Sequence, residues 1–421
     1  MKKQSKLQSI HTVIFIRMEN QMHKYAPFIF VFFLVSLLTA CGSTANTEAI
    51  AVYDLPVPVS IDSTDTHRVV GGAVQGTTLV FNNISSSTFT GTPGSATGFT
   101  NYSTVNGPPA AFNHPTDITT DGKDFYISDY GNNAIRKVVT TDLGEVKEVT
   151  TLQCTTDGTT ASGFYWPTGI TTDGANLYVV DSGTNTIRFI NIESKIVTII
   201  GSTTGAAGSV DSTVPADVRF NQPTGITTDG QNLYVADSGN QTIRRINIDT
   251  KAVSTLAGAS GSTGSTDGIQ GAARFYLPSR ITTDGVSLFV TDFYNRTIRK
   301  IDIVTGSVTT LAGVAGQLGS DNGATDSTDG TGSTARFNQP NGITTDGTYL
   351  YVTDSYLNSI RKIHKETGET TTIIPAGTLH TPLGMTTDGA SLFVADTYTV
   401  TRDPITYLDT HTYSNSIIKV Q

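Results

Sequence analysis

Short strand-like runs of apolar residues recur along most of this chain, and apolar residues at helical spacing do not extend over any long stretch after residue 40. The run Leu233-Tyr234-Val235-Ala236 is one example. Brief apolar runs bounded by turn residues are typical of β-strands. Many of the 41 Gly residues stand beside Thr and Asp, which favours tight turns between short strands. The mature chain is therefore predicted to be all-β.

One sequence pattern returns six times. Its copies begin at Pro115, Pro167, Pro223, Pro278, Pro340 and Pro382, at spacings of 52, 56, 55, 62 and 42 residues. Each of the first five copies contains four strand-like pieces, which in the third copy are residues 225–227, 233–236, 242–246 and 253–258. Four antiparallel strands form one blade, and six blades stacked radially bury each other's faces. The pattern predicts a six-bladed β-propeller.

The repeat also resembles a known family. The pattern P-x-G-I-T-T-D-G-x-x-L-Y-V-x-D-x-x-x-x-x-I-R-K-I, followed by V-T-T-L-A-G, is similar to the NHL repeat, and the resemblance covers about residues 87–421. It implies an NHL-type propeller of four-stranded antiparallel blades over residues 84–421.

The sixth copy ends without a fourth strand, whereas Ser87-Thr88-Phe89-Thr90-Gly91 has the pattern of the missing piece. We therefore expect this N-terminal strand to complete the last blade and close the ring, leaving no edge strand to pair with another chain. On that ground a monomer is expected. Residues 68–83 alternate like a pair of strands, and the sequence gives them no role.

The N-terminal 40 residues have the features of a targeting segment. Lys24 precedes an apolar run from Ala26 to Leu38, which leads to Leu38-Thr39-Ala40-Cys41. This tetrapeptide resembles the lipobox of bacterial lipoproteins, which implies cleavage of signal peptide 1–40 and acylation of Cys41. Residues 41–67, rich in Thr, Ser, Ala and Pro, would then be a tether to the cell envelope. Gly42 and Ser43 lack the Asp that marks inner-membrane retention, so the outer membrane is expected. The alternative is a membrane-spanning anchor, but the run is short of the roughly 20 residues that a span requires.

The charge balance excludes one class of partner. Residues 1–40 carry five Lys and Arg residues and one Glu, so their removal changes the formal net charge from −9 to −13. Binding to nucleic acid depends on Lys and Arg that neutralise phosphates, and a surface this acidic argues against it. Contact with the membrane is accordingly expected through acyl chains on Cys41 alone.

The polar residues that every copy repeats are expected to serve the fold. Asp-Gly pairs suit hairpin turns between the first and second strands. An Asp that ends the second strand and an Arg seven residues later suit an ion pair or a turn-capping network within each blade. The Asp-Gly pairs begin at Asp121, Asp173, Asp229, Asp284, Asp346 and Asp388, and the ion pairs would join Asp129, Asp181, Asp237, Asp292 and Asp354 to Arg136, Arg188, Arg244, Arg299 and Arg361. The loop from Asp321 to Gly332 is the best calcium candidate, although it lacks the EF-hand spacing.

The residues just before each proline differ from copy to copy, and in a propeller they should lie on one face around the central channel. These candidate ligand-binding residues are Asn113, His114, Tyr165, Trp166, Asn221, Gln222, Tyr276, Asn338, Gln339 and His380. Aromatic and amide side chains suit stacking and hydrogen bonding to a sugar or an extended peptide. The alternative is that the larger ones merely fill the channel mouth.

Between its second and third strands the sixth copy inserts a long loop, Thr397–Asn415, and Ile418 replaces the repeated Arg. Arg402 and Tyr407 in this loop join the candidate site. The preferred interpretation is a non-catalytic binding or scaffold module for protein or glycan ligands, without a cofactor and with no catalytic residue assigned. The alternative is a metal-dependent lyase or hydrolase resembling the peptidylhydroxyglycine lyase propeller, with zinc held by His114, His380 and His411.

Overall fold

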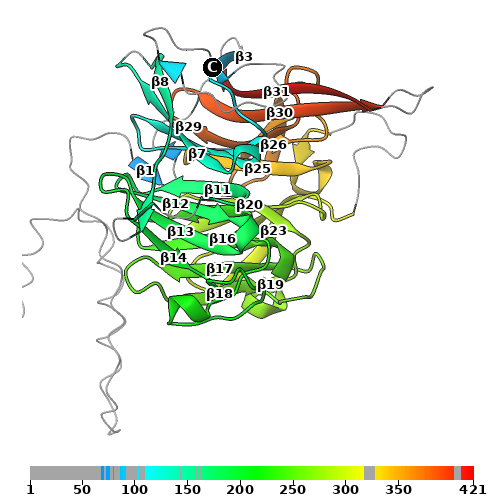
Figure 1. Ribbon diagram of the computed structural model, residues 1–421. Coiled ribbons are helices and arrows are strands. Elements are labelled where there is room, and N and C mark those ends of the chain that lie inside the picture. Colours follow the sequence, from blue (N-terminus) through cyan, green and yellow to red (C-terminus); the bar gives the residue numbers. More distant parts are fainter. Residues whose placement is uncertain are drawn as a thin grey trace, which may run out of the picture. The chain divides into compact units, whose positions relative to one another are not determined.

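Six antiparallel sheets, each built from one copy of the repeat, make up the fold of the unit Val59–Gln421 (Figure 1). The computed structural model describes residues 68–70, 73–75, 79, 86–91, 102–103, 110–142, 144–156, 159–160, 163–316, 328–402 and 409–421. The predicted signal peptide, Cys41 and the tether 41–67 lie outside these residues.

The strands follow the predicted pieces closely. Blade 1 contains β5 (Pro115–Thr120), β6 (Phe125–Asp129), β7 (Ala134–Thr140) and β8 (Val146–Thr151); blade 2 contains β11 (Pro167–Thr172), β12 (Asn176–Asp181), β13 (Thr186–Asn191) and β14 (Val197–Ile200). Blade 3 contains β15 (Gly225–Thr228), β16 (Asn232–Asp237), β17 (Thr242–Asn247) and β18 (Val253–Gly258); blade 4 contains β20 (Pro278–Thr283), β21 (Ser287–Asp292), β22 (Thr297–Asp302) and β23 (Ser307–Gly313). Blade 5 contains β25 (Pro340–Thr345), β26 (Tyr349–Asp354), β27 (Ser359–His364) and β28 (Glu369–Ile374); blade 6 contains β29 (Pro382–Thr387), β30 (Leu392–Arg402), β31 (Asp409–Val420) and β3 (Ser86–Gly91).

The six first strands form a closed ring. Each contacts the first strands of its two neighbours, in the order β5, β11, β15, β20, β25, β29 and back to β5. In blade 6 the fourth strand is β3, which pairs antiparallel with β31. The two ends of the described propeller are thus joined in one sheet, in the arrangement expected from the sequence. The six-bladed, all-β propeller is confirmed.

Three blades have a fifth strand that the sequence does not predict. The two-residue strands β4 (Tyr102–Ser103), β19 (Gly268–Ile269) and β24 (Gly330–Thr331) add to the outer edges of blades 1, 4 and 5. Each belongs to the connection that precedes its blade, so the chain runs back along the outer strand before it enters the ring. These additions cover backbone groups that an outer strand would otherwise leave unpaired.

Apolar side chains are buried between blades. Six clusters are present, one at each junction of neighbouring blades. Between blades 2 and 3, for example, Tyr178 and Phe189 pack with Phe220 and Leu233. Each blade therefore depends on both neighbours for its core.

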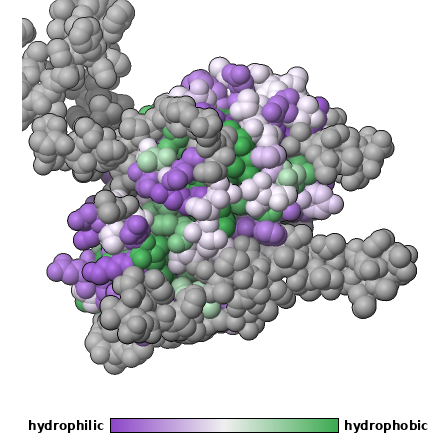
Figure 2. Space-filling view, turned by 90° about the horizontal axis from the view of Figure 1, so that it is seen from above, coloured by the Kyte–Doolittle hydropathy of each residue, from purple (hydrophilic) through white to green (hydrophobic). Residues whose placement is uncertain are grey.

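Seen from above, the surface shows hydrophilic residues around a narrower strip of hydrophobic ones (Figure 2).

The Asp-Gly turns have the predicted role. In blade 1, Asp121 Oδ1 accepts hydrogen bonds from the backbone N–H groups of Lys123 and Asp124, at 2.9 and 2.7 Å. The glycine that follows has a φ of 91°, in the left-handed region that glycine adopts without strain. The other five turns repeat this glycine conformation, with φ between 86° and 94°.

The segment 68–83 contains the predicted strand pair, since β1 (Arg68–Val70) pairs antiparallel with β2 (Ala73–Gln75). β2 contacts the first strands β25, β29 and β5. Farther along, the backbone N–H of Leu79 donates to Asp346 Oδ2 at 3.0 Å, and the Leu79 side chain is buried against blades 5 and 6. β2 and Leu79 therefore lie at the end of the channel where the first strands finish in their Asp-Gly turns.

The insertion in blade 6 is not the loop that the sequence suggested. β30 and β31 continue past the blade as an antiparallel pair, from Tyr398 opposite Tyr413 to Arg402 opposite Asp409, and project beyond the other strands (Figure 1). The segment alternates Thr with larger side chains, a composition that favours paired strands over an irregular loop. Tyr407 lies outside the described residues.

Candidate functional site

The segments before the six prolines and the loops between second and third strands form one face, here called the loop face. In blade 2 the backbone N–H of Gly183, in the loop between strands, donates to the carbonyl oxygen of Tyr165 at 2.9 Å. The same bond joins Gly131 to Asn113 and Gly239 to Asn221. The predicted adjacency of these two sets of loops is therefore observed.

An aspartate at the end of each second strand holds the loop face in place. In blade 1, Asp129 Oδ1 accepts a hydrogen bond from the backbone N–H of Asn113 at 2.7 Å. The equivalent bonds run to Asp181 from Tyr165, to Asp237 from Asn221, to Asp292 from Tyr276, to Asp354 from Asn338 and to Asp396 from His380. These bonds hold the main chain and so do not depend on which side chain stands at each position.

A second contact links neighbouring blades. The residue immediately before the proline has a left-handed backbone in five blades, with φ between 46° and 57° at His114, Trp166, Gln222, Leu277 and Thr381. Such a φ is strained for a bulky or β-branched residue. The backbone N–H of each donates to a side-chain amide oxygen of the preceding blade, supplied by Asn415, Asn133, Asn185, Gln241 and Asn358 at 2.6–3.1 Å. We call these five contacts the amide latches.

The remaining junction, between blades 4 and 5, has no such acceptor because Arg296 occupies the latch position. A guanidinium only donates hydrogen bonds. The N–H of Gln339 bonds instead to Asp354 Oδ1 at 2.8 Å.

The repeated Asp and Arg pair as predicted in blades 1 to 4. The distances are 3.0 Å for Asp129–Arg136 and 2.8 Å for both Asp237–Arg244 and Asp292–Arg299, and Asp181 pairs with Arg188. Burial raises the pKa of Asp129, Asp237 and Asp292 to about 6, against the opposing effect of the N–H donors and the arginine. The arginines also lie over phenylalanine rings, at 4.8–5.3 Å in blades 1 to 5. These residues belong to the frame.

Blade 5 has the capping arrangement without a direct Asp354–Arg361 ion pair. Arg361 forms its ion pair with Asp329 at 2.9 Å, while Asp354 accepts two backbone N–H groups. Asp329 Oδ2 also accepts the N–H of Thr372. This carboxylate belongs to the proposed calcium loop, and its oxygens are engaged within the protein. Asp321 and Asp326, the other carboxylates of that loop, lie outside the described residues.

The ten candidate side chains before the prolines are all at least partly exposed. Tyr165, Trp166 and Tyr276 are exposed by 45%, 43% and 42%. These three side chains are therefore accessible to solvent. Two surface hollows, of about 350 and 250 Å³, are lined by other residues, among them Tyr178 in the first and Phe393 in the second. The ten candidate residues line neither of these two hollows.

The histidines of the metal alternative have protein partners. His114 Nδ1 lies 2.7 Å from Asn113 Oδ1, and His380 Nδ1 lies 3.4 Å from Asp396 Oδ2. Arg402 and His411 stand on the paired strands of the blade 6 extension, where the structure describes the backbone alone. Among the residues whose side chains are described, no three His, Cys, Asp or Glu are grouped as a metal site.

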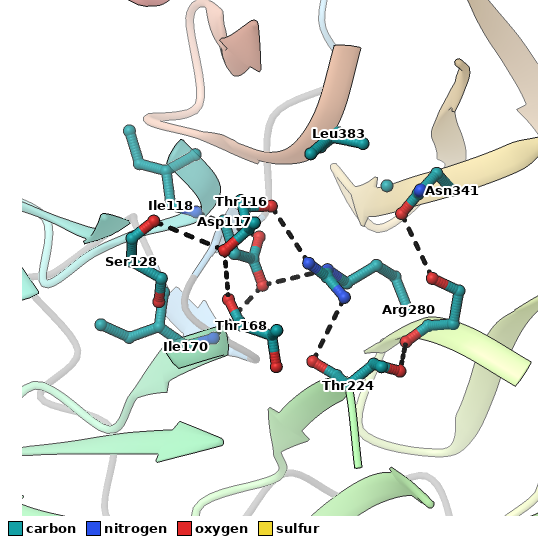
Figure 3. A network of polar contacts seen from close by, with 12 residues as sticks. Thr116, Asp117, Ile118, Ser128, Thr168, Ile170, Thr224, Arg280, Asn341 and Leu383 are labelled. Carbon is teal, nitrogen blue, oxygen red and sulfur yellow. Dashed lines mark hydrogen bonds and ion pairs between the residues drawn. The ribbon is translucent and has the colours of Figure 1, made fainter. Parts of the chain in front are cut away.

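The sequence analysis missed an ion pair in the channel. Asp117 and Arg280 are almost fully buried, with Arg280 Nε 3.5 Å from Asp117 Oδ2 (Figure 3). Arg280 also donates to the carbonyl oxygens of Thr116 and Thr224, at 3.1 and 3.2 Å. Burial raises the pKa of Asp117 to about 6, although Arg280 opposes the rise. The pair spans the channel between blades 1 and 4.

A signal for this pair is present in the sequence. The third position of the repeated first strand reads Asp117, Gly169, Gly225, Arg280, Gly342 and Gly384 around the ring. A Cβ on Gly169 would lie 2.5 Å from the carbonyl oxygen of Thr224 in the next blade. The first strands thus approach too closely for side chains at the glycine positions, and the two exceptions carry opposite charges.

Among the residues that the structure describes, we find no helix long and apolar enough to span a membrane.

Comparison with known proteins connects the repeat to a family. A model of the NHL repeat matches residues 220–246. The chain is 27% identical over 286 residues to SUPPRESSOR OF QUENCHING 1, chloroplastic, of Arabidopsis thaliana, which covers 63% of this chain and 26% of that protein. It is 28% identical over 298 residues to NHL repeat-containing protein 2 of Homo sapiens, covering 61% of this chain and 40% of that one. The match therefore spans less than half the length of these relatives.

Solved structures share the fold. A structural genomics protein of unknown function from Bacteroides thetaiotaomicron has a TM-score of 0.55 at 18% identity, and an auxiliary nutrient binding protein from the same organism has 0.54 at 14%. Each match covers 80% of this chain and 76% of the other.

Proposed function

Because the chain is a six-bladed β-propeller of the NHL-repeat family, we propose that it is a non-catalytic binding or scaffold module that holds protein or glycan ligands on its loop face. One observation carries this proposal. The main chain before each proline is fixed by the aspartate at the same position in all six blades, while the residue it holds is Asn, Tyr or His and is at least partly exposed. A constant frame with variable exposed side chains is an arrangement suited to recognition.

The engagement of the repeated charged residues supports the non-catalytic part of the proposal. The paired Asp and Arg of blades 1 to 4 bond to each other and to the main chain in every copy. A catalytic centre needs an asymmetric group of residues near the substrate. The fold shared with an auxiliary nutrient binding protein further supports the choice of a binding role.

A binding assay with loop-face variants tests this function. The full chain is applied to arrays of glycans and of extended peptides, beside a variant with Tyr276→Ala and Gln339→Ala. The control is Val286→Ala, which removes an exposed side chain from the Asp-Gly turn at the opposite end of blade 4. We expect the loop-face variant to lose at least one ligand that the control retains. Equal binding by all three chains, or chemical conversion of a bound ligand, would reject the proposal.

We further propose that the propeller is attached to the bacterial outer membrane through acyl chains on Cys41. The lipobox-like sequence before Cys41 and the polar stretch 41–67 support this location. Replacing Cys41 with Ser should release the protein into the soluble fraction after cell lysis. A Cys41→Ser chain that stays in the membrane fraction after a salt wash would contradict it.

A further inference from the structure

Three aromatic rings are stacked on the loop face where blades 1 and 2 meet. The ring of Trp166 lies 4.5 Å from that of Tyr165 at an interplanar angle of 19°, and 5.9 Å from that of Tyr130 at 16°. We call these three residues the aromatic stack. Tyr165 and Trp166 remain nearly half exposed, although burial of aromatic surface is strongly favourable. The stack thus leaves part of the aromatic surface of Tyr165 and Trp166 in contact with solvent.

The frame holds these rings in position before any ligand arrives. Trp166 is the residue whose left-handed backbone is fixed by the amide latch from Asn133, and the N–H of Tyr165 is bound by Asp181. The Tyr165 ring lies directly over Gly183, where a Cβ would collide with it. Rings already ordered by the protein lose little further entropy when a ligand binds.

The loops between second and third strands around the stack are polar and contain no charged residue. The loops between second and third strands in blades 1, 2 and 3, residues 130–133, 182–185 and 238–241, contain no Lys, Arg, Asp or Glu. They contain Asn, Gln, Ser and Thr, whose amides and hydroxyls both donate and accept hydrogen bonds. Blade 4 differs, because its loop contains Arg296. This sector therefore matches a ligand that is neutral, rich in hydroxyl groups and apolar on one face.

We propose that the aromatic stack binds a neutral oligosaccharide, with the C–H face of a pyranose ring against the exposed aromatic surface and its hydroxyls bonded to Asn133 and Gln222. Both of these amide residues are exposed and belong to the loop face. The inference rests on the proposed binding function and names its ligand class. A proline-rich peptide fits less well, since such peptides occupy grooves between aromatic side chains. Rings in contact at 4.5 Å leave no groove between them.

Trp166 is the only tryptophan of the chain, so the tryptophan fluorescence of the protein comes from this site alone. Tryptophan emission of the full chain is followed during titration with cellohexaose, xylohexaose and mannohexaose, and with decaproline as the peptide probe. We expect a saturable change with at least one oligosaccharide. Tyr130→Ala should weaken that binding at least tenfold, and Tyr130→Phe, which keeps the ring, should retain it. Tyr356→Ala, which removes an exposed loop-face tyrosine from blade 5, should leave the affinity unchanged.

The outcomes separate this inference from the proposed function. Glycan binding detected by calorimetry that leaves the emission unchanged and survives Tyr130→Ala would overturn the assignment to the aromatic stack while sustaining the loop-face function. A saturable response to decaproline alone would overturn the saccharide class. Absence of binding to every glycan and peptide on the arrays would overturn both.

Discussion

Removal of the cation from the channel tests how the Asp117–Arg280 pair contributes to stability. Arg280→Met keeps an aliphatic side chain of similar length but leaves the Asp117 carboxylate buried without a counter-ion. The two side chains are exposed by only 10% and 8%. Breaking a buried ion pair by removing one partner costs about 3–5 kcal/mol. The carbonyl oxygens of Thr116 and Thr224 would also lose a donor each. We therefore expect the free energy of unfolding to fall by about 3–5 kcal/mol at pH 7.

The loss should depend on pH in a defined direction. Burial raises the pKa of Asp117 from 3.8 to about 6, and Arg280 is the largest influence that opposes the rise. A raised pKa means that the folded chain binds the proton more tightly than the unfolded chain, so this group stabilises the fold in acid. That stability is present below pH 3.8 and is lost as the pH rises through about 6. Without Arg280 the pKa of Asp117 should rise further, so the deficit of the variant should be larger at pH 8 than at pH 5.

Guanidinium unfolding at pH 5 and pH 8 measures both effects in the wild type, Arg280→Met, Asp117→Asn and the double variant. The double variant contains neither charge, so its loss should be smaller than the sum of the two single losses by more than about 0.5 kcal/mol. Additive losses, or a deficit of Arg280→Met that grows toward pH 5, would refute the reasoning.

Three further predictions concern the frame. Gly169→Ala should lower the free energy of unfolding by about 1–3 kcal/mol because its Cβ meets the next blade's main chain at 2.5 Å, whereas Gly163→Ala, with open space around the Cβ, should be nearly neutral; equal denaturation midpoints would contradict this. Asn358→Ala should cost about 1–3 kcal/mol, since the N–H of Thr381 loses its acceptor, and an unchanged midpoint would show that the latch contributes nothing. Deletion of residues 42–95 removes β3 and should sharply lower the melting temperature measured by circular dichroism; a melting curve like that of the full chain would refute the closure of blade 6.

The period of the repeat was sufficient to predict the blades, because six nearly identical copies leave little choice of strand boundaries. The Asp-Gly turns and four of the five Asp–Arg pairs were predictable for the same reason, since both depend on contacts within about 10 residues. The pairing of Arg361 with Asp329 was not, because the two residues are 32 positions apart and the path of the intervening chain decides the contact. The outer strand β24 likewise consists of two residues without an apolar pattern.

The candidate site was predicted in part. The residues before each proline differ between copies, and this variation identified the loop face. Tyr130 lies elsewhere, in the loop between the second and third strands of blade 1. Nothing in the sequence of one copy connects this loop with Trp166, which belongs to the next copy. The link depends on the ring placing blade 1 beside blade 2. The alignment of the first strands shows Asp117 and Arg280 where the other copies have Gly. That the two residues form an ion pair follows only from the closed ring, which brings them together although they are 163 positions apart in the sequence.

Because the amide latches bind the main chain, they form whichever side chain stands before the proline. A latch binds the main-chain N–H of the displayed residue, and five residues as different as His, Trp, Gln, Leu and Thr occupy that place. Mutation can therefore sample new side chains at these positions without rebuilding the scaffold. A library randomised at His114, Trp166, Gln222, Leu277 and Thr381 would keep the latch bonds, and the members that tolerate the left-handed backbone would offer a starting framework for directed evolution of new binding reagents.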